Sequence, residues 1–313
     1  MISLISIGIL SGLFFSTTFI LNRMMSLEGG HWLWSASLRY AFMILILIGF
    51  ISLLKGVGTI KGLVRLFFKN WKFWMVAGSI GFGMFYSLIC FSADHSPGWI
   101  IAAIWQLTII ATLVVLMGFG RSFPKKVWLF SMIVLTGVLL INLGHAQTSS
   151  FRELVFGGLP ALIAAFCYPI GNQLVWEAIN GNPSLPNIND PLVENPFHKV
   201  LLLSWGSVPF WLILVAVVRP PMPSGGQMFN TFLVALFSGV IATSLFLMAR
   251  NRSSKPSELA AVDATQSSEV IFALIGEIVI LKAPLPGYLS IAGMCLVFIG
   301  LGLFVRFQEV EKR

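Results

Sequence analysis

The chain has 313 residues, of which 57% are hydrophobic and only 10% are charged. Soluble domains carry about 25% charged residues, so this composition excludes an ordinary soluble protein and indicates an all-α integral membrane protein. The net charge of +8 does not indicate nucleic-acid binding, because the basic residues lie in short gaps between apolar runs and form no patch or amphipathic arm.

Ten apolar runs follow one another along the chain, and a helix of about 20 such residues crosses the hydrocarbon core of a membrane. Turn signals separate most of the runs, such as "RPPMPSGG" between the seventh and the eighth. The first run lacks the basic start and small-residue cleavage site of a signal peptide, so we expect it to remain as a helix. The expected spans are about 3–22, 31–54, 72–92, 97–119, 127–145, 154–176, 199–218, 229–249, 259–281 and 287–306.

Lys and Arg residues are distributed unequally between the two sets of connections. One set carries fifteen of them, including the five between positions 55 and 72, and the alternate set carries only four, which are Arg23, Arg152, Arg219 and Lys282. Cytoplasmic loops carry the excess of basic residues. The bias therefore places both termini in the cytoplasm, together with the polar loop 177–198 between spans six and seven.

The two halves of the sequence, 1–145 and 154–313, resemble each other weakly and in the same order. "FSTTFILNR" (15–23) matches "AFCYPIGNQ" (165–173), and "PGWIIAAIWQLT" (97–108) matches "KPSELAAVDATQ" (255–266). Five is an odd number of spans, so the second half enters the membrane from the opposite side. Such inverted repeats are typical of secondary transporters, which bind their substrate between the halves.

Over its whole length the chain resembles the drug/metabolite transporter superfamily in its ten-helix form. The resemblance is carried by Asn22 and Arg23 at the end of span one, by Arg39 in "SLRYAF", and by the glycine-spaced tenth span, 287–303. It is greatest to the branch labelled as multidrug resistance efflux transporters, and it implies a transporter. Spans one and six contain no internal acid, so the first-helix coupling glutamate of the related four-helix exporters has no counterpart here.

Three carboxylates interrupt the ninth span, at Asp263, Glu269 and Glu277. At about 100° per residue they share an arc of roughly 120° with Gln266, so a regular helix would turn one polar stripe towards the bundle. An unpaired charge at mid-membrane costs at least about 2.5 kcal/mol. We interpret Glu269 as the proton-coupling site, with Asp263 and Glu277 as its cytoplasmic and outer relays. The alternative is that these acids form ion pairs that only position helices.

Arg39 is the only basic residue deep inside an expected span. Its depth lies between those of Glu269 and Glu277, so we expect it to form an ion pair with one of them. The alternative is that its long side chain extends outward to the membrane surface.

Polar and aromatic residues on other spans are candidates for the wall of a substrate site. Aromatic rings beside carboxylates suit a lipophilic cation, through charge and cation–π contact. The alternative is that these rings only pack or face lipid. The candidates, beside Gln266, are Tyr86, Trp105, Thr108, Thr112, Tyr168 and Asn172.

These features favour a proton-coupled secondary transporter of a bacterial plasma membrane that exports hydrophobic or cationic compounds. An exporter or permease for an amino acid, sugar or nucleoside is the alternative, and a polytopic membrane protein without transport activity is a further one. No HExxH, GxSxG or Walker A motif indicates an enzyme or a nucleotide-driven pump. We expect no cofactor, and no metal site, since the histidines and Cys90, Cys167 and Cys295 lack ligand spacing.

Overall fold

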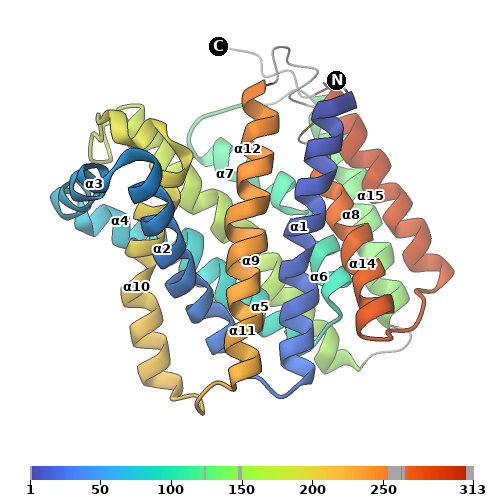
Figure 1. Cartoon of the computed structure of the whole chain (residues 1–313). Helices are drawn as coiled ribbons and strands as arrows, with labels where there is room; N and C mark the ends of the chain where they lie inside the picture. The colour runs from blue at the N-terminus through green and yellow to red at the C-terminus, as the bar shows by residue number, and fades with distance from the viewer. Residues whose placement is uncertain (1, 123–124, 147–149, 253–261, 263–264, 308–313) are drawn as a thin grey trace.

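The computed structural model describes residues 2–122, 125–146, 150–252, 262 and 265–307, and all regular structure within them is helical. Figure 1 shows long helices running side by side, with α1 beginning and α15 ending at the same end of the bundle. The elements are α1 (Ile2–Leu27), α2 (Trp32–Lys55), α3 (Val57–Lys69), α4 (Trp71–Gly78), η1 (Ser79–Met84), α5 (Phe85–Ala93), α6 (Gly98–Trp105), α7 (Thr108–Gly118), α8 (Lys125–Ala146), α9 (Phe151–Ile179), η2 (Pro191–Glu194), α10 (Pro196–Val218), α11 (Gly225–Val234), η3 (Ala235–Ala242), α12 (Thr243–Arg252), η4 (Thr265–Ser267), α14 (Ser268–Ile280) and α15 (Tyr288–Phe307).

Within the described residues, eight helical stretches are long and apolar enough to cross a membrane, and they correspond to the first eight expected spans. They are Ser3–Leu27, Trp32–Lys55, Trp71–Ala93, Gly98–Gly118, Val127–Ala146, Phe151–Ile179, Pro196–Val218 and Gly225–Ala249. The helix α15 covers the tenth expected span. The ninth expected span, 259–281, falls partly outside the described residues.

Two of the spans change their winding midway. The π-helical segments η1 and η3 interrupt the third and the eighth span and begin at residues 79 and 235. The fourth span breaks between α6 and α7, and a short 3₁₀ turn, η4, precedes α14. The expectation of one regular helix in the described part of the ninth span is therefore wrong, because a 3₁₀ turn advances with 3.0 residues per turn and shifts Gln266 relative to Glu269.

The amphipathic helix α3 lies within a segment that the sequence analysis treated only as a basic connection. Leu63 and Leu66 are buried on one side of it, whereas Lys61, Arg65 and Lys69 are exposed on the other. At 13 residues the helix is too short to cross a membrane. It lies across the direction of the long helices (Figure 1), as an interfacial helix does.

Glycines allow close packing of α8 along α15. A Cβ atom added to Gly137 would lie 2.7 Å from the carbonyl oxygen of Gly293. Small residues let two membrane helices approach until their backbones touch. Elsewhere α1 packs against α14, η3 and α12, whereas α9 packs against α6, α7, η1 and α5.

Candidate functional site

Glu269 and Glu277 lie on one face of α14, about 80° apart around the helix and about 12 Å apart along it. Both are covered by protein, with 5% and 1% of their surface exposed. Glu277 Oε1 accepts a hydrogen bond from the backbone N–H of Gly98 at the start of α6. Its other oxygen, Oε2, is buried and has no partner among the described residues. This carboxylate therefore joins α14 to α6.

Glu269 has a different environment. It lies in the first turn of α14, next to the 3₁₀ turn, and within the described part of the chain no residue donates a hydrogen bond to it or forms an ion pair with it. Gln266, in the 3₁₀ turn η4, has a buried Nε2 without a partner in the described structure. The third acid, Asp263, lies outside the described residues. A buried carboxylate at the start of a helix can take up a cation or a proton, since no described residue neutralises it.

The expected ion pair between Arg39 and either glutamate is not formed, and this prediction is wrong. The Arg39 guanidinium lies over the ring of Tyr86, 4.0 Å from its centroid, and Nη2 donates a hydrogen bond to Ser238 Oγ at 3.2 Å. Glu277 is instead occupied by the backbone of Gly98. Arg39 is 9% exposed, and its Nε has no partner among the described residues. The alternative of an outward-extending side chain does not hold either.

Hydrogen bonds extend this arginine centre to α1. Asn22 Nδ2 donates to Tyr86 Oη at 3.0 Å. Thr18 Oγ1 donates to Ser238 Oγ at 2.7 Å. The centre thus connects α1, α2, α5 and η3 around one buried cation. The sequence did not indicate Thr18, Ser238 or the hydrogen bond of Asn22, because a hydroxyl or an amide within an apolar run does not reveal which residue it will contact.

An aromatic cluster lies between the third, fourth and sixth spans. The rings of Phe85 and Trp105 have centroids 4.9 Å apart, and Tyr168 lies 5.2 Å from Phe85 and 5.5 Å from Trp105. Tyr168 keeps 37% of its surface accessible. Thr108 joins this region by donating to the carbonyl of Ala165 on α9 at 3.1 Å.

The structure thus brings together three predicted wall residues, Trp105, Thr108 and Tyr168, and Tyr86 adjoins them through Phe85 at 5.8 Å. Two others are bonded within their own helices: Thr112 donates to the Thr108 carbonyl, and Asn172 donates to the Tyr168 carbonyl. Phe85 was not among the candidates, because a single phenylalanine is indistinguishable from the many that pack or face lipid.

An apolar groove of about 490 Å³ opens beside this region, between the third span, α9 and α10. Met84 and Ser87 line one wall, and Pro160, Phe210 and Leu214 line the others. Pro160 lies inside α9, where it cannot donate a backbone hydrogen bond.

At the other end of α9 a polar network ties the fourth span to the sixth. Glu177 Oε1 lies 3.9 Å from Arg121 Nη2 and accepts a hydrogen bond from Gln173 at 2.8 Å. Asn182 donates to Glu177 Oε2 at 3.1 Å, and the Arg121 guanidinium lies 5.1 Å from the centroid of the Trp176 ring. This network fastens the start of the 177–198 loop to the end of α7.

Metal-binding geometry is missing from the described part of the chain, where no three His, Cys, Asp or Glu residues gather at ligand distance. Cys90 and Cys167 are buried free thiols and Cys295 is an exposed one. Asp94, in the loop after α5, is partly buried, and this burial raises the pKa of its carboxyl above the usual value.

Comparison with known proteins gives one family match and two similar sequences. The family model described as "EmrE: Putative multidrug resistance efflux transporter" matches residues 2–310. "Uncharacterized protein YjlA" of Bacillus subtilis (strain 168) is 41% identical, over 98% of this chain and 96% of its own length. "Uncharacterized 42.1 kDa protein in intracellular alkaline protease 3'region" of Shouchella clausii is 34% identical, over 84% of this chain and 69% of its own.

A solved crystal structure is also similar. It superposes with a TM-score of 0.62 and covers 96% of both chains, at 15% sequence identity. At this identity the similarity shows the fold alone.

Proposed function

Because the chain belongs to the EmrE family of multidrug resistance efflux transporters, within the drug/metabolite transporter superfamily, we propose that it exports hydrophobic or cationic compounds in exchange for protons. It is a multi-pass membrane protein of a transporter family, and such transporters move small molecules. Its similar sequences come from bacteria, so we propose that it lies in a bacterial plasma membrane. The Lys and Arg distribution favours an orientation with both termini in the cytoplasm.

Alternating access between two inverted halves of five spans, 1–145 and 154–313, is the mechanism we propose. Two features support it. The π-helical segments η1 and η3 occur in the third span of each proposed half. The packing of α1 against α14 and the eighth span has its counterpart in the packing of α9 against α6, α7 and the third span. Halves related in this way can rock about a central site.

Glu269 is the residue to which we assign proton coupling, and its burial without a partner among the described residues is the observation that carries the proposal. A lone carboxylate charge at such a depth is costly, so either a proton or a cationic substrate would neutralise it. Binding of one would then exclude the other, which is the exchange that an antiporter requires. Glu277, already held by Gly98, and Asp263 are proposed as the outer and cytoplasmic relays.

The aromatic cluster of Phe85, Trp105 and Tyr168 is our proposed surface for the organic part of the substrate. Tyr168 lies within electrostatic range of both Glu269 and Arg39. A planar or lipophilic cation on these rings would make cation–π contacts, each worth about 0.5–2 kcal/mol, and would lie within electrostatic range of a carboxylate. Thr108, Thr112, Asn172 and Gln266 would supply hydrogen bonds.

Arg39 favours a second candidate function, the export of a polar metabolite that carries an acidic group. The arginine is buried without a carboxylate at ion-pair distance in the described structure, and both its Nε and Asn22 Oδ1 are without partners there. A substrate carboxylate would supply the missing charge and accept from the guanidinium.

Transport into proteoliposomes under an imposed pH gradient tests the proposal. Purified protein and its Glu269→Gln variant would be compared with Glu194→Gln, which changes an exposed acid in the same chain. We expect uptake of a lipophilic cation to collapse in Glu269→Gln and to persist in the control. Unchanged gradient-driven uptake in Glu269→Gln would remove this residue from the mechanism, and selective uptake of amino acids would establish the second candidate.

A further inference from the structure

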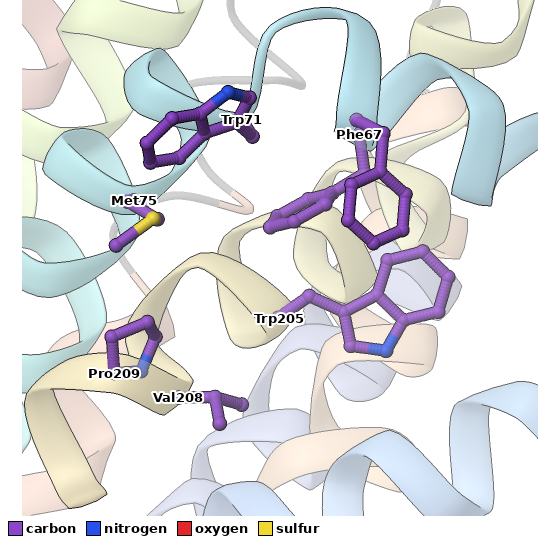
Figure 2. A pocket seen from close by; sticks show the side chains of 7 residues that line it. Phe67, Trp71, Met75, Trp205, Val208 and Pro209 are labelled. Carbon is purple, nitrogen blue, oxygen red and sulfur yellow. The ribbon is translucent and has the colours of Figure 1, made fainter.

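A second groove, of about 390 Å³, lies away from the proposed transport site, where α3 and α4 meet α10. Figure 2 shows its labelled wall: Phe67 on α3, Trp71 and Met75 on α4, and Trp205, Val208 and Pro209 on α10. All of these side chains are apolar, and the rings of Phe67 and Trp205 pack edge to face with centroids 6.0 Å apart. The groove suits a hydrocarbon chain, since the two indole N–H groups are the only polar side-chain groups among its lining residues.

The rim of the groove is strongly basic. Positions 55–72 contain five Lys or Arg residues and no acid. Lys72 Nζ lies 5.6 Å from the centroid of the Trp71 ring, which lines the groove, and Lys69 is exposed at the end of α3, two residues before Trp71. Positive charge therefore stands at the mouth of an apolar groove.

Helix α3 places this groove at a membrane surface. Lys61, Arg65 and Lys69 recur at every fourth position and so share one face of the helix. Val57, Val64 and Phe68 are exposed beside them, with 61%, 38% and 67% of their surface accessible. An amphipathic helix of this kind lies in the interface, with its apolar face among acyl chains and its basic face among anionic headgroups.

We propose that the groove between α3, α4 and α10 is a binding site for an anionic phospholipid. One acyl chain occupies the apolar groove against Trp71 and Trp205, and the headgroup contacts Lys69 and Lys72. The bound lipid holds α3 against α10, which otherwise meet through few groups such as Phe67 and Trp205. This site is independent of the proposed proton coupling, because neither glutamate of α14 contributes to it.

Native mass spectrometry of the purified full chain, titrated with phosphatidylglycerol or phosphatidylcholine, measures the preference. The test variant is Lys69→Gln/Lys72→Gln. The matched control, Lys125→Gln/Arg252→Gln, removes the same charge from two other exposed positions. We expect the intact protein and the control to prefer phosphatidylglycerol. In the test variant we expect this preference to fall about thirtyfold, because each basic contact at a membrane surface is worth about 1 kcal/mol.

Chain occupancy needs its own measurement, since the basic rim alone would attract anionic lipid without filling the groove. Phosphatidylglycerol with brominated acyl chains quenches nearby indoles, so we expect Trp71→Phe and Trp205→Phe each to reduce the quenched fraction of fluorescence. Equal retention of the two lipids, a preference unchanged in Lys69→Gln/Lys72→Gln, or quenching insensitive to both tryptophans would each overturn the proposal. Circular dichroism of every variant establishes that the helices remain folded.

Discussion

The guanidinium of Arg39 lies over the ring of Tyr86 at 4.0 Å from its centroid, so a buried cation rests on a π face where the sequence predicted a carboxylate. The ring is itself fixed, because its hydroxyl accepts from Asn22. This arrangement holds α2 to α5 and α1 while leaving the arginine charge uncompensated by any acid of the described residues.

Replacing Tyr86 by phenylalanine keeps the π face and removes only the hydroxyl. We expect Tyr86→Phe to lose about 1 kcal/mol of stability through the hydrogen bond to Asn22. Tyr86→Leu should lose more, because the cation–π contact with Arg39, worth about 2 kcal/mol when desolvated, is lost as well. Thermal unfolding in detergent would measure both, and equal losses would show that the ring face contributes nothing.

Glu277 should stabilise the packing of α14 against α6, because its Oε1 accepts a hydrogen bond from the backbone N–H of Gly98. Glu277→Gln keeps an acceptor and is expected to fold with a small loss of stability, since a charge-assisted hydrogen bond is roughly twice as strong as a neutral one. Glu277→Leu leaves the Gly98 N–H buried without an acceptor and should cost about 1–3 kcal/mol more. If both variants unfold at one temperature in detergent, the contact does not hold α6 to α14.

Gly137 should tolerate no side chain, because the backbone of α15 occupies the space. We expect Gly137→Ala to separate α8 from α15 and to destabilise the protein by about 1–3 kcal/mol, the usual cost of overpacking. Gly49→Ala is the control, since nothing lies within 4 Å of a Cβ atom there. That control should be neutral or stabilising by up to about 1 kcal/mol, as alanine favours a helix. A loss of equal size in both variants would contradict this account.

Asp94 should make stability depend on pH. Burial raises the pKa of its carboxyl above the unfolded value, so the folded protein binds this proton more tightly. The contribution of this carboxyl to the free energy of unfolding is therefore fully present below the unfolded pKa of about 4. It is lost as the pH rises through the raised pKa of the folded protein.

We expect Asp94→Asn to flatten the profile of unfolding temperature against pH above about pH 4, since asparagine does not titrate. The exposed Glu194→Gln variant provides the comparison. A profile for Asp94→Asn that falls as steeply as that of the unchanged protein would assign the pH dependence to other groups.

Composition and hydropathy were enough to identify an integral membrane protein and to locate eight of its spans. A run of about 20 apolar residues in lipid must satisfy its backbone hydrogen bonds internally, and a helix does so. Hydropathy alone therefore locates such a span. The resemblance to the drug/metabolite transporter superfamily was likewise carried by local residues, and the family match confirms it. The burial of Glu269 and Glu277 was foreseeable for the same reason, since carboxylates are too costly to face lipid.

Tertiary structure decided everything that depends on a partner. Arg39 rests on Tyr86 and Glu277 accepts from Gly98, so the obvious pairing of opposite charges was wrong. The break between α6 and α7 and the 3₁₀ turn before α14 altered the side-chain directions that a regular helix would give. Helix α3 was missed although its amphipathic pattern is present in the sequence, because at 13 residues it is too short to be recognised as a membrane span. Periodicity in the sequence indicates which residues avoid water. Which groups contact one another depends on the distances between helices, and only the folded chain determines those distances.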